Sequence, residues 1–224
     1  MTLVREALLV SGKDLRIERR AKVTLLQVVP FAAIVLLLFA FALDPDRGVL
    51  TRAAPGLFWI AVLLASLLAV SRSFAVEAEN GARDALRLSG LDPMAIFLGK
   101  SLAVLAQLLV LEVVLTIGVV VLYDLSLRSL VPLALASVAA TIGVVATGIV
   151  YGVLTAGLRL RETLVPLLVL PVVTPALLGA TRAWEASVDG VPGEAWPWVA
   201  VLGAFALIAG TVGLLAFGPL LEES

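Results

Sequence analysis

Apolar residues in this chain form long unbroken blocks that are separated by short polar interruptions. Runs such as LLQVVPFAAIVLLLFAFAL lack the two-residue alternation of a membrane β-strand. A helix that crosses the hydrocarbon needs about 20 mostly apolar residues, and lipid leaves no other way to satisfy the backbone of such a block. The pattern predicts six spanning α-helices, at residues 24–43, 54–73, 94–122, 130–156, 164–181 and 197–219.

Composition supports this fold class. Hydrophobic residues make up 61% of the chain and charged residues 15%, whereas soluble domains have about half and about a quarter. We therefore predict an all-α integral membrane protein with a single domain over residues 1–224. Cysteine and histidine are both absent, which excludes disulfides, imidazole metal ligands and the usual haem axial ligands. We expect no cofactor in this chain, and no basic aromatic patch suggests nucleic acid.

The distribution of Lys and Arg predicts the orientation. Residues 1–22 hold six basic and three acidic residues. The second predicted loop, counted with the charges at its edges, adds Arg72, Arg83, Arg87 and Lys100, and the fourth adds Arg159 and Arg161, so this side has twelve basic residues, against four in the opposite loops. The positive-inside rule then places both termini in the cytoplasm. Residues 1–22 form a cytoplasmic segment, either a simple anchor or a helix lying at the headgroups.

Two further stretches have more than one interpretation. Ala40-Phe41-Ala42 resembles a signal-peptidase site, but the preceding apolar block is long for a signal peptide, so we expect an uncleaved first span. The predicted far-side loop TRAWEASVDGVPGEAWPW has three tryptophans that fit an interfacial belt, or alternatively face a substrate: Trp184, Trp196 and Trp198.

Small residues recur at every fourth position of the fourth predicted span, interrupted only by Val144: Ala136, Ala140, Gly148, Gly152 and Ala156. Such a ladder lets helices approach closely, within one subunit or across a dimer. In the fifth span, Pro171 and Pro175 remove backbone hydrogen bonds. They predict a broken or kinked helix, which either lines a path or is static, with hydroxyls such as Thr174 satisfying freed carbonyls.

One ionisable residue, Glu112, lies well inside the third predicted span, with Gln107 before it. An intramembrane carboxyl is a functional candidate, and the alternative is a protonated or hydrogen-bonded group that serves packing. No phosphate-binding loop, zinc motif or nucleophile elbow occurs in the chain. We therefore expect a protein that is not an enzyme.

Residues 74–93, FAVEAENGARDALRLSGLDP, form the predicted cytoplasmic loop between the second and third spans. Asn80-Gly81 is turn chemistry, Ala82 to Leu88 favour a helix, and Gly90 and Asp92-Pro93 predict a helix stop and a new helix start. The short helix would have a charged side and an apolar side that includes Leu86. It is either a solvated connector or a rigid foot that docks into a partner.

The chain resembles the haem exporter protein B (CcmB) family, the membrane subunit of the cytochrome c maturation ABC transporter and a type-2 ABC permease. The resemblance rests on RAAPGLFWIAVLLASLLAVSRSF at 52–74, on the pattern ENGxxxxLxLSGLDPxxxFLGK at 79–100 and on LVLPVVTPALLGA at 168–180. The segment Ala-Pro-Gly-x-x-Trp within the first block is its most specific part, and the likeness covers essentially the whole chain.

The resemblance implies a permease in the bacterial inner membrane that pairs as two copies with two copies of a cytoplasmic ABC ATPase subunit, where ATP binds. Residues 77–88 would be the coupling helix, and the ATPase contact would use Glu77, Glu79, Gly81, Arg83, Leu86 and Arg87. A haem-handling membrane subunit and a periplasmic haem chaperone would be further partners. Alternatives are a type-2 permease for a lipid or drug, and a scaffold that only assembles the complex.

Overall fold

The protein consists of seven α-helices in the part of the chain that the structure describes, and this part holds no β-strand. The computed structural model describes residues 2–21, 29–43, 47–79, 90–155 and 161–223. The helices are α1 (Leu3–Ala21), α2 (Val29–Leu43), α3 (Arg47–Glu79), α5 (Pro93–Tyr123), α6 (Leu130–Thr155), α7 (Arg161–Asp189) and α8 (Pro192–Glu223). The prediction of an all-α fold is confirmed.

Five helices, α3 and α5 to α8, are long and apolar enough to cross a membrane. They coincide with five of the six predicted spans, although α3, α7 and α8 extend well beyond the predicted bounds. The first predicted span, at 24–43, corresponds to α2, an apolar helix of 15 residues. The first residues of the predicted span, 24–28, lie outside the described part, so a sixth span stays a prediction.

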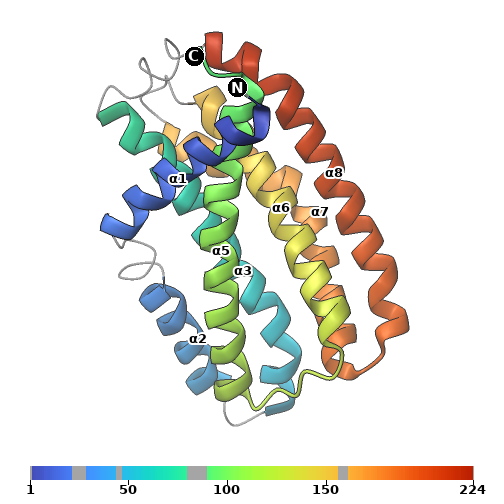
Figure 1. Ribbon diagram of the computed structural model, residues 1–224. Helices are drawn as coiled ribbons and strands as arrows, with labels where there is room; N and C mark the ends of the chain where they lie inside the picture. Colours follow the sequence, from blue (N-terminus) through green and yellow to red (C-terminus); the bar gives the residue numbers. More distant parts are fainter. Residues whose placement is uncertain (1, 22–28, 44–46, 80–89, 156–160, 224) are drawn as a thin grey trace.

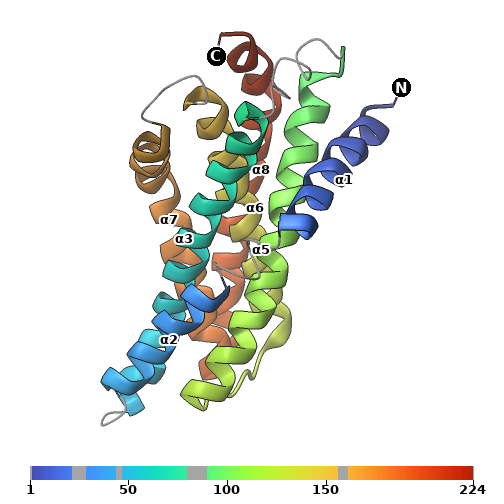
Figure 2. The same cartoon turned by 90° about the vertical axis from the view of Figure 1, so that its left-hand side faces the viewer.

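Helices α5 and α6 form the centre of the packing, since α6 contacts α8, α7, α5 and α3, and α5 contacts α1, α2, α3, α6 and α8. Helix α1 packs on α5, and α2 lies at the edge of the bundle against α5 and α3. Figures 1 and 2 show both chain ends at one end of the bundle, together with the end of α3 and the start of α5. We call this the terminal end and the opposite one the distal end.

The predicted far-side loop is mostly helical, which corrects the sequence interpretation. Helix α7 continues to Asp189 and α8 begins at Pro192, so that only Gly190 and Val191 connect them at the distal end. Gly190 has a φ of +76°, a left-handed conformation that glycine adopts without steric cost.

The prediction that Trp184 anchors in the interface is wrong. Its side chain is fully buried and stacks on Phe58, with ring centroids 4.4 Å apart. The indole Nε1–H donates to Ser137 Oγ at 3.2 Å. Because α7 continues past the predicted span, Trp184 faces the core in register with Ala180. Trp196 and Trp198 are exposed, as an interfacial belt requires.

The prolines of α7 do not break the helix, so the broken form of the expected helix is wrong, and a kink stays a prediction. Residues 161–189 are one continuous α-helix that contains Pro171 and Pro175. Both prolines lie on its exposed face, whereas Val169 and Val173 are buried. The Thr174 hydroxyl donates to the Leu170 carbonyl at 2.6 Å. Since proline removes the bond to the residue four positions earlier, Leu170 O is not one of the carbonyls that the prolines free.

The small residues of α6 pack within the subunit. A methyl group on Gly148 would lie 2.9 Å from Val70 Cγ2 of α3. One on Gly152 would collide with the Phe74 ring of the same helix. Ala136 and Ala140 are also fully buried. This resolves the two interpretations of the ladder for Gly148 and Gly152 in favour of contacts between α6 and α3.

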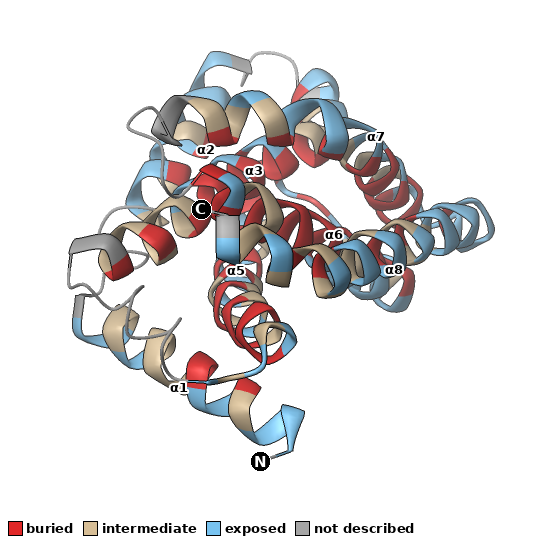
Figure 3. Ribbon diagram, turned by 90° about the horizontal axis from the view of Figure 1, so that it is seen from above, coloured by how far each residue is buried: buried red, intermediate tan, exposed pale blue. Residues whose placement is uncertain are grey.

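Exposed apolar side chains cover the outer surfaces of the bundle. Figure 3 shows the buried residues turned toward the centre and the exposed ones along the outside of α8. Leu207, Ile208 and Leu215 of α8 are each more than half exposed, at 74%, 64% and 67%. An apolar outer surface of this kind is what a helix bundle in lipid presents.

Helix α1 lies so close to α5 that a glycine is required at the crossing. A methyl group on Gly99 of α5 would lie 2.5 Å from Val10 Cβ and 2.7 Å from the Ala7 carbonyl oxygen. Ala7 and Val10 are buried by this contact. The N-terminal segment is therefore a helix seated on the bundle rather than a free anchor.

We predict that Gly99→Ala destabilises the protein by about 1–3 kcal/mol, the usual cost of forcing a methyl group into a packed contact. The α1 backbone would have to move away, because the Ala7 carbonyl cannot rotate aside. Denaturant unfolding of the purified protein in mixed micelles measures the loss. Gly203→Ala is the matched control, since nothing lies within 4 Å of that position, and a loss of equal size there would contradict the explanation.

Candidate functional site

The candidate site lies at the terminal end, where α1 meets the hairpin formed by α3 and α5. Helix α3 runs on to Glu79, six residues past the predicted span, and α5 begins at Pro93. Asp92 caps α5 by accepting a hydrogen bond from the Met94 N–H at 2.8 Å, as predicted. Gly90 has a φ of +68°, a conformation common just after a helix end, although the helix that it was predicted to stop lies outside the described residues.

Most of the predicted coupling residues fall outside this description. Gly81, Arg83, Leu86 and Arg87 belong to residues 80–89, which the structure does not describe. Glu79 is the last residue of α3, but its side chain is not described. Their role in an ATPase contact therefore stays a prediction, and Glu77 alone can be located.

Glu77 faces inward between three helices. Val70, Phe74 and Glu77 follow one another at helical spacing and are all buried, so Glu77 continues the core face of α3. Its Oε1 accepts a hydrogen bond from Lys13 Nζ of α1 at 2.8 Å and lies 2.7 Å from Lys100 Nζ of α5. One carboxylate oxygen thus joins α1, α3 and α5.

Lys100 is the most deeply buried charge of this group, with 1% of its surface exposed. Its ammonium also donates to Ser73 Oγ at 3.2 Å and lies 4.7 Å from the centre of the Phe74 ring. Asp14 Oδ2 of α1 is 3.8 Å away, close enough for an ion pair. A buried ammonium needs such partners because isolated charges are costly to remove from water.

Lys13 and Asp14 complete the connection to α1, with Lys13 Nζ 3.0 Å from Asp14 Oδ1. Burial lowers the pKa of the Lys13 ammonium, but the hydrogen bonds and negative charges of Glu77 and Asp14 outweigh it and hold this pKa above its usual 10.5. Lys13 is therefore charged at neutral pH, and its ion pairs are present under physiological conditions.

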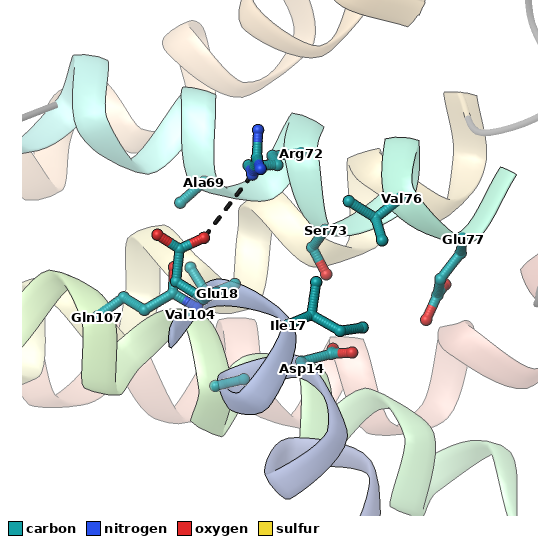
Figure 4. A pocket seen from close by; sticks show the side chains of 11 residues that line it. Asp14, Ile17, Glu18, Ala69, Arg72, Ser73, Val76, Glu77, Val104 and Gln107 are labelled. Carbon is teal, nitrogen blue, oxygen red and sulfur yellow. Dashed lines mark ion pairs between the residues drawn. The ribbon is translucent and has the colours of Figure 1, made fainter. Parts of the chain in front are cut away.

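A second ion pair lies beside the first group, across a pocket. Arg72 Nε of α3 is 3.7 Å from Glu18 Oε2 of α1, and Figure 4 shows the two side chains facing each other, with Asp14 below and Glu77 at the opposite end. The pocket between α1, α3 and α5 measures about 420 Å³ with its open mouth. We call the six charged residues the ionic junction: Lys13, Asp14, Glu18, Arg72, Glu77 and Lys100.

The ionic junction has three cationic and three anionic side chains, so its charges balance. The described residues contain no group of three His, Cys, Asp or Glu residues placed to hold a metal ion. Nothing in the junction pairs a nucleophile with a base, as covalent catalysis needs. Its arrangement suits mechanical connection of three helices.

Glu112 is buried in the middle of α5, away from the ionic junction, with 4% of its surface exposed. The Thr141 hydroxyl of α6 donates a hydrogen bond to Glu112 Oε1. This is the interhelical contact that the packing interpretation expected, and it does not by itself decide between packing and function.

Sequence reasoning missed five of the six junction residues as parts of a site: Lys13, Asp14, Glu18, Arg72 and Lys100. Lys100 was counted as a loop charge, although it falls six residues inside the predicted span that begins at Met94. An ionisable residue within an apolar helix indicates a partner elsewhere. The partner on α3, Glu77, could have been found from its helical spacing to Val70 and Phe74.

Comparison with known proteins adds the family. Residues 5–224 match the family described as CcmB protein. The chain belongs to the CcmB family. Heme exporter protein B of Pseudomonas aeruginosa is 31% identical, over 89% of this chain and 90% of the relative. The Escherichia coli K12 relative of the same name is 32% identical over 91% of each chain, and that of Haemophilus influenzae 30% identical over 95% of each.

Membership of the CcmB family confirms the resemblance seen at residues 52–74, 79–100 and 168–180. The match extends over nearly the whole chain, so the ionic junction and the α3–α5 hairpin both lie within the region shared with the family. With its five long apolar helices, this CcmB protein is a multi-pass membrane protein.

We predict that Lys100→Met destabilises this CcmB protein by about 3–5 kcal/mol, the usual loss when one partner of a buried ion pair is removed. Glu77 would keep only Lys13, and the charges of the junction would no longer balance. Denaturant unfolding in mixed micelles measures the change.

A double variant that restores the charge balance of the junction tests the explanation more directly. Lys100→Met combined with Glu77→Gln removes one charge of each sign, and we expect it to recover most of the lost stability. Arg16→Met serves as the control, because Arg16 is exposed. If the double variant were as unstable as the sum of the single variants, charge balance would not explain the burial of Lys100.

Proposed function

We propose that this chain is the permease subunit of an ABC transporter that uses ATP hydrolysis in a partner subunit to support haem delivery for cytochrome c maturation. The observation that carries the proposal is the family match over residues 5–224. Relatives named heme exporter protein B align over about nine tenths of their length, and their name supports haem as the transported molecule.

The α3–α5 hairpin supports a coupling role for residues 80–89. It joins two long helices, and both of its ends are fixed, by the last turn of α3 and by the Asp92 cap of α5. A short amphipathic helix in this position is suited to dock its apolar side into a groove of a partner. We assign the ATPase contact to Glu79, Gly81, Arg83, Leu86 and Arg87.

Glu77 has a different place in this proposal. Only 5% of the surface of Glu77 is exposed, and its carboxylate forms ion pairs with Lys13 and Lys100. We therefore assign Glu77 to positioning the base of the hairpin, where it affects the ATPase contact through α3.

The proposed complex contains two copies of this chain and two copies of the cytoplasmic ATPase subunit, in the bacterial inner membrane. Both termini and the hairpin would face the cytoplasm, which the excess of basic residues on that side supports. A haem-handling membrane subunit and a periplasmic haem chaperone would complete the pathway. This chain would supply no catalytic group, and ATP and haem would be held by its partners.

We predict that Leu86→Asp releases the ATPase subunit, because a buried charge on the apolar side opposes docking. Co-purification of the two subunits in detergent measures the contact, and circular dichroism checks that the membrane helices stay folded. Asp84→Lys, a charge change on the same segment outside the apolar side, should leave the contact intact. Undiminished co-purification of Leu86→Asp would remove the coupling assignment.

The same preparation separates the alternatives. A permease coupled to ATP hydrolysis changes the ATPase rate when it is added to the partner, whereas a scaffold does not. Loss of cytochrome c maturation in a deletion strain, restored by this chain, would support haem delivery. Normal maturation in that strain would favour a type-2 permease for a lipid or drug.

We predict that Glu112→Gln retains full cytochrome c maturation if Glu112 serves packing, since glutamine can still accept the hydrogen bond from Thr141. A proton relay would be abolished, because an amide does not titrate. Complementation of the deletion strain measures the outcome, and protein abundance in the membrane is measured in parallel. Thr141→Val tests the bond itself, with an expected loss of about 1 kcal/mol of stability.

A further inference from the structure

The ionic junction lies directly beside the segment assigned to ATPase contact. Glu77 is two residues before the end of α3 at Glu79, and Lys100 is seven residues after the start of α5 at Pro93. Both side chains connect to α1 through Lys13 and Asp14. The chain on either side of residues 80–92 is thus joined to a third helix.

Helix α1 is held along most of its length on one face. The Asp92 N–H donates to Glu6 Oε2 at 3.1 Å, Val10 packs against Gly99, and Lys13 and Glu18 form ion pairs with α3. From residue 6 to residue 18 these contacts extend over about 18 Å of helix. Each contact involves the hairpin, on α3, on α5 or at Asp92.

The opposite face of α1 has a different character. Val4, Leu8 and Leu9 are exposed, and so are Arg16 and Arg20. No ion pair of Arg16 or Arg20 occurs in the described part of the chain. The fastening of α1 is therefore specific to the face that meets α3 and α5.

We propose that the ionic junction makes α1 a transmitting element, which moves as one body with the inner ends of α3 and α5 when the hairpin is displaced. This inference rests on the proposed function, since it requires a partner that acts on residues 80–89. Sliding of α1 along α5 would break the Lys13–Glu77 and Asp14–Lys100 ion pairs. Glu77 and Lys100 would then keep only each other in a buried site, which is unfavourable because each would lose a compensating charge. Joint movement keeps every pair.

The consequence concerns α2, the next helix in the chain. Only residues 22–28 separate α1 from α2, and α2 packs on α5 and α3. A displacement of the hairpin that carries α1 with it would also act on α2 from its N-terminal side. The ionic junction would thus distribute one movement over four helices.

The test uses Lys13→Gln combined with Glu18→Gln, which removes one charge of each sign from α1 and leaves the buried Glu77–Lys100 pair in place. Arg16→Gln is the matched control on the exposed face of the same helix. Lys13→Arg combined with Glu18→Asp keeps the charges and serves as the rescue. Each variant is reconstituted in nanodiscs with the ATPase subunit.

Three quantities are measured: hydrogen exchange of α1 amides, co-purification of the ATPase, and the change in ATPase rate caused by the permease. We expect faster exchange in α1, unchanged co-purification, and at least about a fivefold loss of the rate change, the lower end of typical coupling between sites. The control and the rescue should behave like the native chain.

Unchanged exchange of α1 would overturn the fastening, and faster exchange with a native rate change would overturn the transmission. Both outcomes are observed with the ATPase bound, so they leave the proposed function standing. A native chain that bound no ATPase would overturn the proposed function and the transmission together, while the exchange data would still decide whether the junction fastens α1.

Discussion

A charge that is removed from water must find an opposite charge nearby, and this requirement governs how the terminal end of the protein is assembled. Lys100 sits on an apolar helix with almost no exposed surface. Its opposite charges come from Glu77 on α3 and Asp14 on α1, so three helices must be correctly placed before the Lys100 ammonium is fully paired. The interaction therefore acts as a check on assembly, because the absence of one partner would leave an uncompensated buried charge.

Elsewhere in the bundle, close apolar packing between helices determines which helices associate. Lipid gives little hydrophobic driving force between helices, so close approach and polar contacts decide which helices associate. Gly99 lets α1 approach α5 closely, and Gly148 and Gly152 of α6 let α3 approach α6. Two polar contacts reinforce this packing inside the spans, from Thr141 to Glu112 and from Trp184 to Ser137.

Features set by local sequence or by the membrane were predictable. The lengths of the apolar blocks predicted six spans, and five of them are long helices in the structure, because the bilayer fixes the length of a span. Asp92-Pro93 predicted a helix start from capping chemistry alone. Trp184 was misplaced because its polar neighbours resemble a loop, and its burial depends on Phe58 and Ser137 from other helices. The junction escaped prediction for the same reason, since the partners of Lys100 lie on α1 and α3. The coupling residues 80–89 stay a prediction.

The short turn at Gly190 and Val191 limits how the bundle can deform. Two residues between α7 and α8 hold these helix ends together, and the Ser129 N–H donates to the Ser187 carbonyl at 3.2 Å, which ties the start of α6 to the same place. The terminal end has the longer connection, residues 80–92 between α3 and α5. The helices are consequently held together by a short covalent turn at the distal end, and by the ion pairs between α1, α3 and α5 at the end where the two termini lie.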